Sequence, residues 1–85
     1  MQIKFNKKFV KRLEVSSSLI RRNFENNLSI FISNKFNHLL NNHSLNGEYS
    51  GCRSINITGD WRAIFKDDGE VVVFITIGKH SQLYK

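Results

Sequence analysis

The stretch WRAIFKDDGEVVVFITI, residues 61–77, decides the fold because it has the pattern of a β-hairpin. Residues 61–65 and 70–77 are rich in β-branched and aromatic side chains, which are typical of strands. Between them lies Asp68-Gly69, a dipeptide that tolerates the positive φ angles of a two-residue turn. The sequence therefore predicts two antiparallel strands joined by a tight turn.

The length of the turn sets the register of the hairpin. If Asp67 pairs with Glu70, two like charges face each other across the turn, so a slightly longer loop is the alternative. The two-residue turn would place Phe65 opposite Val72, Ala63 opposite Phe74 and Arg62 opposite Ile75. With either turn, side chains alternate between the two faces. Trp61, Ala63 and Phe65 then share one face, and Arg62, Ile64 and Lys66 share the other.

The residues before the hairpin predict one more strand and two helices. Residues 52–57 alternate like a strand and follow a polar turn region at 41–51. Residues 16–40 contain an amphipathic helix, with serines at 16–18 as N-cap candidates. Its apolar stripe is Leu19/Ile20, Phe24, Leu28, Phe31/Ile32 and Phe36, and its solvated face is Arg21, Arg22, Glu25, Asn26 and Lys35. A basic helix over Lys7–Leu13, capped by Asn6, follows a short first strand at residues 1–5.

This order predicts a single α+β domain over residues 1–85 with two layers: a short first strand, two N-terminal helices and an antiparallel sheet. The helices pack on one face of the sheet. Two short helices cannot cover both faces of three or four strands, so the second face should be partly open. Chains of this size have room for one core only.

The charge balance favours an anionic partner. Lys and Arg number 13 against 7 Asp and Glu, which gives a net charge of +6 and a pI near 9.8. Such a surface attracts polyanions, including nucleic acid, although basicity could equally serve solubility. The single cysteine and the lack of a signal-peptide pattern favour the cytoplasm. No apolar run approaches the roughly 18 residues of a membrane span, so no membrane partner is expected.

Polar residues gather near the predicted strand ends. No cysteine, histidine or glycine motif for a metal or nucleotide is present, so neither metal nor cofactor is expected. Each polar residue alone has an ordinary structural explanation, but an antiparallel meander brings Asp60 and Arg62 close to His80. The candidate residues are His43, Arg53, Asn56, Asp60, Arg62, Lys79, His80 and Tyr84.

Two histidines, a carboxylate, an arginine and a phenol suit one reaction in particular. Cleavage of RNA by its own 2′-hydroxyl needs a base, cationic donors for the charge on phosphorus, and an acid for the leaving 5′-oxygen. Histidine can be acid or base near neutrality, and arginine grips phosphate oxygens with two donors. No metal is needed for this chemistry.

The C-terminal half resembles the RelE/ParE-type toxins of bacterial toxin-antitoxin systems, in particular the YafQ-like mRNA interferases. A His-x-Leu-x-Gly turn spans residues 43–47, and an arginine, Arg53, opens the next strand. Asp-Trp follows at 60–61, and Gly-x-His-x-x-Leu-Tyr closes the chain at 78–84. The N-terminal half matches only in layout. The resemblance implies a RelE-like fold and a ribosome-dependent mRNA endonuclease that a cognate antitoxin inhibits.

The resemblance also implies roles for individual residues. His80 would be the general acid, and Asp60 and His43 would share the work of base and hydroxyl positioning. Tyr84 would stack on or orient a nucleotide. Arg62 falls where RelE-like members carry a catalytic arginine that clamps the phosphate. Apart from these catalytic residues, the predicted RNA- or phosphate-binding residues are Arg53, Asn56, Lys66 and Lys79. Asn56 departs from the family pattern, which often has a histidine there; asparagine can donate a hydrogen bond but cannot carry a proton.

Two other functions fit the same fold or charge. Gyrase-inhibiting toxins of this superfamily act by binding a protein and need no acid-base pair, so His80, Asp60 and Tyr84 together argue against them. A non-catalytic RNA-binding module would fit the basic charge equally well. Stacking aromatics, however, are sparse on the predicted open face.

Overall fold

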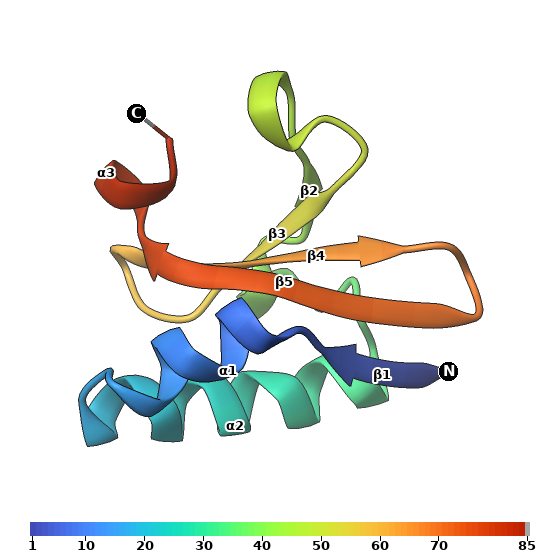
Figure 1. Ribbon diagram of the computed structural model, residues 1–85. Coiled ribbons are helices and arrows are strands. Elements are labelled where there is room, and N and C mark those ends of the chain that lie inside the picture. The colour runs from blue at the N-terminus through green and yellow to red at the C-terminus, as the bar shows by residue number, and fades with distance from the viewer. Residues whose placement is uncertain (85) are drawn as a thin grey trace.

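The computed structural model describes residues 1–84 and has the predicted α+β architecture (Figure 1). Two α-helices lie on one face of a five-stranded sheet, and a short third helix lies on the other side. The elements are β1 (Gln2–Phe5), α1 (Lys7–Glu14), α2 (Ser18–Ser33), η1 (His38–Leu40), β2 (His43–Ser44), η2 (Gly47–Tyr49), β3 (Arg53–Asn56), β4 (Trp61–Asp67), β5 (Val71–Lys79) and α3 (His80–Leu83), where η marks a 3-10 helix.

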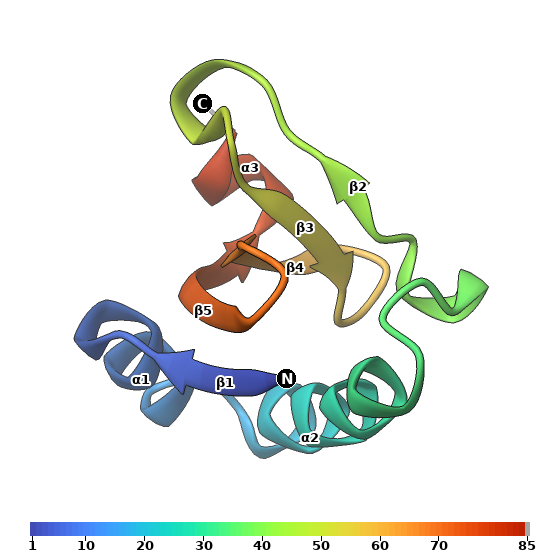
Figure 2. The same ribbon diagram turned by 90° about the vertical axis from the view of Figure 1, so that its right-hand side faces the viewer.

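The sheet is mixed rather than wholly antiparallel. Its strand order is β1-β5-β4-β3-β2, and β2 to β5 form an antiparallel meander. β1 instead runs parallel to β5, with Phe5 opposite Phe74. The two long helices carry the chain from β1 to the opposite edge of the sheet, so the meander ends beside β1 (Figure 2). Parallel neighbours need such a crossover connection.

Residues 68–70 separate β4 from β5, so the two-residue register is wrong and the longer loop is confirmed. Asp67 pairs with Val72, not with Glu70. The Asp68 carboxylate accepts hydrogen bonds from the amides of Val71 and Glu70, at 2.8 and 3.0 Å, and these bonds lower its pKa. Gly69, with φ +94°, takes the left-handed conformation that the turn requires. Side-chain bonds of this kind favour the wider turn.

A β-bulge in β5 also changes the predicted pairing. Phe65 lies opposite Phe74 but Ile64 lies opposite Thr76, so Ile75 is an extra residue on β5. The extra residue reverses the alternation of faces, which puts both Phe74 and Ile77 in the core. Ala63 therefore faces Ile77 and Arg62 faces Gly78, not the predicted partners. The bulge therefore determines that Gly78, at the end of β5, lies opposite the predicted site residue Arg62.

Aromatic rings dominate the core between the helices and the sheet. Phe9, Phe31, Phe65 and Phe74 are fully buried, and Phe24 is nearly so. Rings of this kind are attracted both by burial of apolar surface and by edge-to-face contacts. The Phe74 ring is the centre of the group, with centroid distances of 5.6 Å to Phe5, 5.5 Å to Phe9, 5.5 Å to Phe24, 5.7 Å to Phe31 and 5.4 Å to Phe65.

Helix α2 is shorter than predicted. It begins after the Ser17 cap, as expected, but ends at Ser33. Asn34 and Asn37 then accept hydrogen bonds from amides two residues onward, at 3.1 and 2.9 Å, and such local bonds compete with a helix. The predicted stripe is correspondingly broken, because Phe36 lies outside the helix. Of the predicted stripe, Ile20, Phe24 and Phe31 are buried, whereas Leu19, Ile32 and Phe36 are exposed.

Lys35, predicted on a solvated helix face, belongs instead to the connection between α2 and the sheet. Its ammonium group lies 2.7 Å from the carboxylate of Asp67. The hydrogen bond from Lys35 is the main reason that the pKa of Asp67 is lowered. This ion pair ties the end of β4 to the segment that follows α2.

The second face of the sheet is covered more than predicted. Ser54, Ile64 and Thr76, which lie side by side across three strands, are fully buried. α3 and the loop that contains η2 lie over this face, opposite α1 and α2 (Figure 1). Leu83 of α3 is buried there. Over residues 1–84, none of the helices has the length and apolar character of a membrane span.

Candidate active site

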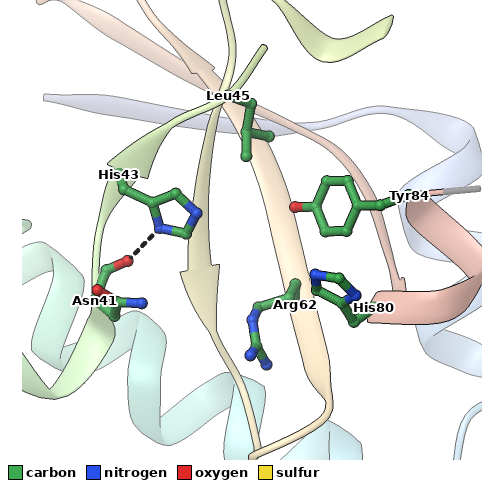
Figure 3. A pocket seen from close by; sticks show the side chains of 6 residues that line it. All are labelled: Asn41, His43, Leu45, Arg62, His80 and Tyr84. Atoms are coloured by element: carbon green, nitrogen blue, oxygen red, sulfur yellow. Dashed lines mark hydrogen bonds between the residues drawn. The ribbon is translucent and has the colours of Figure 1, made fainter. Parts of the chain in front are cut away.

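A pocket of about 370 Å³ opens on the face of the sheet away from α1 and α2. Its walls come from the segment around β2, from the start of β4 and from α3. The side chains converge from three separate parts of the chain (Figure 3). The lining residues are Asn41, His43, Leu45, Arg62, His80 and Tyr84.

His43 is held with one ring nitrogen fixed and the other free. Asn41, in the left-handed conformation at φ 48°, presents its carbonyl oxygen 2.8 Å from His43 Nδ1. A carbonyl oxygen only accepts, so in the neutral ring the hydrogen is on Nδ1 and the lone pair is on Nε2. Figure 3 shows Nε2 on the side of the ring that faces the pocket. The Nε2 lone pair of neutral His43 is therefore available on the pocket side.

His80 opens α3 at the opposite wall. Its backbone amide donates a hydrogen bond of 2.8 Å to the carbonyl oxygen of Asp60. The imidazole packs against the Tyr84 ring one helical turn later, with 4.6 Å between the ring centroids. The ring is exposed, so a substrate can reach it. β5 and the β3–β4 turn together fix the position of His80.

Gly78 fits the end of β5 because it has no side chain. β5 continues through Gly78 to Lys79. The space around Gly78 is too small for a side chain. An added Cβ would lie 2.8 Å from Arg12 Nη2 and 3.2 Å from Gln82 Oε1. The same Gln82 oxygen accepts the Lys79 amide at 3.0 Å and so starts α3.

Arg62 lies between the two histidines (Figure 3). Its Nη1 donates hydrogen bonds to backbone carbonyls of the β3–β4 turn, at 3.0 Å to Thr58 and 3.2 Å to Gly59. These bonds use one of the guanidinium nitrogens and hold the side chain in place. The guanidinium carries further N–H donors, which suits it to an anion.

Tyr84 forms the wall beside His80. Figure 3 shows its ring across the pocket from His43. The phenol oxygen is buried and has no hydrogen-bond partner within residues 1–84. A buried hydroxyl without a partner is uncommon and costly, so it marks a place where a ligand group could bind.

Asp60 and Asn56 lie next to the pocket without lining it. Asp60 is exposed, and it touches the site through its backbone carbonyl rather than its carboxylate. Asn56 is opposite Arg62 on the neighbouring strand and so shares its face of the sheet. The side-chain oxygen of Asn56 is buried and, among the described residues, unpaired.

The three remaining candidates lie away from the pocket. Arg53 is on the face toward α2, where its Nε donates to Asn42 Oδ1 at 2.7 Å and its guanidinium lies 5.5 Å from the Phe36 ring. Lys66 is exposed on the distal half of β4, and Lys79 is exposed at the end of β5. None of the three lines the pocket, although Lys79 directly precedes His80 in the chain.

Two lining residues were not predicted. Leu45 belongs to the His-x-Leu-x-Gly turn and gives an apolar wall. Asn41 was read as part of a polar turn, although asparagine is among the few residues that adopt the left-handed conformation readily. The one signal in the sequence for Asn41 as a site residue was its position two residues before His43. In the described part of the chain, no three His, Cys, Asp or Glu side chains are grouped as a metal site would require.

The fold is that of the RelE-type toxins. YafQ from E. coli strain BL21(DE3) has a TM-score of 0.84 and 18% identity, over 99% of this chain and 98% of that chain. The toxin-antitoxin complex DinJ-YafQ of E. coli gives 0.80 and 19%, over 99% and 98%. The RelB-RelE antitoxin-toxin complex of Methanococcus jannaschii gives 0.76 and 23%, over 95% and 94%.

Sequence comparison identifies the family. The family described as bacterial toxin of type II toxin-antitoxin system, YafQ, matches residues 1–85, and this chain belongs to it. No curated protein matches the sequence. The family and the RelE-like fold predicted from the sequence are thereby confirmed.

Proposed function

We propose that this toxin is a ribosome-dependent mRNA endonuclease that cleaves RNA by attack of the 2′-hydroxyl. The observation that carries the proposal is the placement of His43 and His80 on opposite walls of one pocket, with Arg62 between them. A base and an acid on either side of a phosphate are what this reaction needs. Gyrase inhibition would need neither histidine.

The reaction follows from the geometry. His43 Nε2 takes the proton of the 2′-hydroxyl, and the 2′-oxygen attacks phosphorus. The Arg62 guanidinium stabilises the negative charge on the phosphoryl oxygens. Protonated His80 gives its proton to the 5′-oxygen as the P–O5′ bond breaks. The products are a 2′,3′-cyclic phosphate and a 5′-hydroxyl end.

The adjacent residues support this pair. Asp60 acts as a positioning residue, because its carbonyl accepts the His80 amide at 2.8 Å. Asn56 can donate its amide hydrogens to a phosphate oxygen beside Arg62. Tyr84 offers a ring for stacking and an unpaired phenol that can orient the nucleotide. The exposed Lys66 and Lys79 add to the positive field that attracts RNA.

The proposal includes two macromolecular partners. Solved structures of E. coli YafQ with DinJ and of RelE with RelB are antitoxin complexes, so a cognate antitoxin is the expected inhibitor. The pocket has a volume of only about 370 Å³, so it can hold little more than the nucleotides on either side of the cut. The ribosome would supply the remaining contacts to the mRNA by presenting it in the A site.

Cleavage should therefore depend on ribosomes. Purified toxin is incubated with one mRNA in the presence and absence of translating ribosomes, and cuts are mapped by primer extension. We expect cuts within translated codons only when ribosomes are present. Release of the same fragments from naked mRNA at an equal rate would show that the ribosome is not required.

A further inference from the structure

A second hollow, of about 200 Å³, borders Tyr84. Tyr84 also lines the pocket that contains His43 and His80. The walls of the hollow come from the loop that contains η2 and from the end of α3, which both lie on the face of the sheet opposite α1 and α2 (Figure 1). Its lining residues are Asn46, Gly47, Glu48, Tyr49, Leu83 and Tyr84.

The walls of this hollow are aromatic and apolar. The rings of Tyr49 and Tyr84 meet edge to face, with centroids 6.3 Å apart and planes at 86°. Leu83 is buried behind them and anchors α3 to the sheet. Burial raises the pKa of the Tyr49 phenol, and the Glu48 carboxylate raises it further, so the phenol keeps its proton at neutral pH. These contacts keep the two rings in place.

The rim of the hollow is polar and exposed. Asn46 and Glu48 are exposed, and neither side chain has a hydrogen-bond partner within residues 1–84. Gly47 separates them in a left-handed conformation, with φ +66°. An amide and a carboxylate are thus available beside two aromatic rings. Unpaired bases of single-stranded RNA are recognised by such a combination, through stacking and through hydrogen bonds to their edges.

We propose that this hollow is a subsite for one RNA base, that of the nucleotide on the 3′ side of the cut. The proposal rests on the function proposed above. His80 protonates the 5′-oxygen, which belongs to that downstream nucleotide. The Tyr84 ring packs against the His80 ring, with centroids 4.6 Å apart, and Tyr84 also lines the hollow. The hollow therefore lies close to the proposed acid. The downstream base then stacks on Tyr49 or Tyr84, away from His43.

Glu48 gives the subsite a preference among bases. An ionised carboxylate only accepts hydrogen bonds. Adenine, cytosine and guanine each present an exocyclic amino group that donates to it. Uracil has no amino group, and its two carbonyl oxygens flank its single N–H and repel a carboxylate. The subsite therefore discriminates against uracil immediately after the cut.

The test compares cleavage patterns of variants on ribosome-bound mRNAs that differ only in the base after the cut. Glu48→Gln should lose about 5- to 100-fold of the discrimination against uracil, because an amide can donate to a uracil carbonyl whereas a carboxylate cannot. Tyr49→Ala should cut about 5- to 100-fold more slowly on every base, because a stacking ring is lost. Ser50→Ala is the matched control and should cut at the parent rate, because Ser50 is the next residue and is exposed but does not line the hollow.

The outcomes separate the subsite from the catalytic proposal. If the parent toxin cuts but shows no preference after the cut, and Glu48→Gln leaves the pattern unchanged, the subsite is wrong while the endonuclease assignment stands. If the parent cuts no ribosome-bound mRNA, both proposals fail. Thermal melting of each variant is measured alongside. If Tyr49→Ala melts like the parent and also cuts like it, the stacking role is overturned.

Discussion

Replacing His80 with alanine is expected to slow mRNA cleavage about a hundredfold to ten-thousandfold, the usual effect of removing a positioned acid or base. The imidazole is exposed and lines the pocket, so its loss removes the proposed acid without opening the core. The fold, the melting temperature and antitoxin binding should stay as in the parent. Single-turnover cleavage on ribosomes measures the chemical step separately from binding.

Ser81→Ala is the matched control for His80→Ala. Ser81 is the next residue of α3 and is also exposed, but it does not line the pocket. It should cut at the parent rate. Parent-rate cleavage by His80→Ala would contradict the catalytic role, and so would a fall in melting temperature large enough to account for the lost activity.

Replacing Phe74 with alanine is expected to cost about 3–5 kcal/mol of unfolding free energy, the range found when a buried phenylalanine is truncated. Phe74 is fully buried at the centre of the aromatic group, so the cavity would be enclosed on both sides by helices and strands. Small domains have only about 5–15 kcal/mol of net stability. The variant would therefore lose a large part of its net stability at 25 °C. Urea titration measures this loss of unfolding free energy.

Phe36→Ala provides the comparison for the core. The same atoms are removed, but the Phe36 side chain is 60% exposed. Its contact with Arg53 is a surface cation–π contact of about 0.5–1 kcal/mol. The Phe74 variant should therefore lose several times more stability than the Phe36 variant. Equal losses in the two variants would mean that the aromatic centre is not where the structure places it.

The strands of the meander were predictable because their signals are local. Residues 71–77 are all β-branched or aromatic and residues 61–65 are rich in such side chains, and both segments are strands. The bulge at Ile75 was not predictable, because it depends on burying both Phe74 and Ile77 in one core. The parallel pairing of β1 with β5 was also not predictable, because it depends on the path that the chain takes through the two helices after β1.

The candidate site was predictable in part for the same reason. The expected convergence of Arg62 and His80 is present, because β4 and β5 are antiparallel neighbours. Arg53 and Asp60 are not in the pocket, since the face and direction of a side chain depend on register and turn geometry. Sequence distance alone does not carry that information. The hydrogen bond that orients His43 likewise required the backbone of Asn41 in three dimensions.

The central claim is that the RNA cuts itself through its own 2′-hydroxyl, with His43 and His80 transferring the protons. The most direct measurement uses a ribosome-bound mRNA with a single 2′-deoxy nucleotide on the 5′ side of the mapped cut, beside the unmodified mRNA. The unmodified RNA should yield a 2′,3′-cyclic phosphate and a 5′-hydroxyl, and the deoxy substitution should abolish that cut. Continued cleavage of the deoxy substrate at the same bond, leaving a 5′-phosphate, would contradict the mechanism.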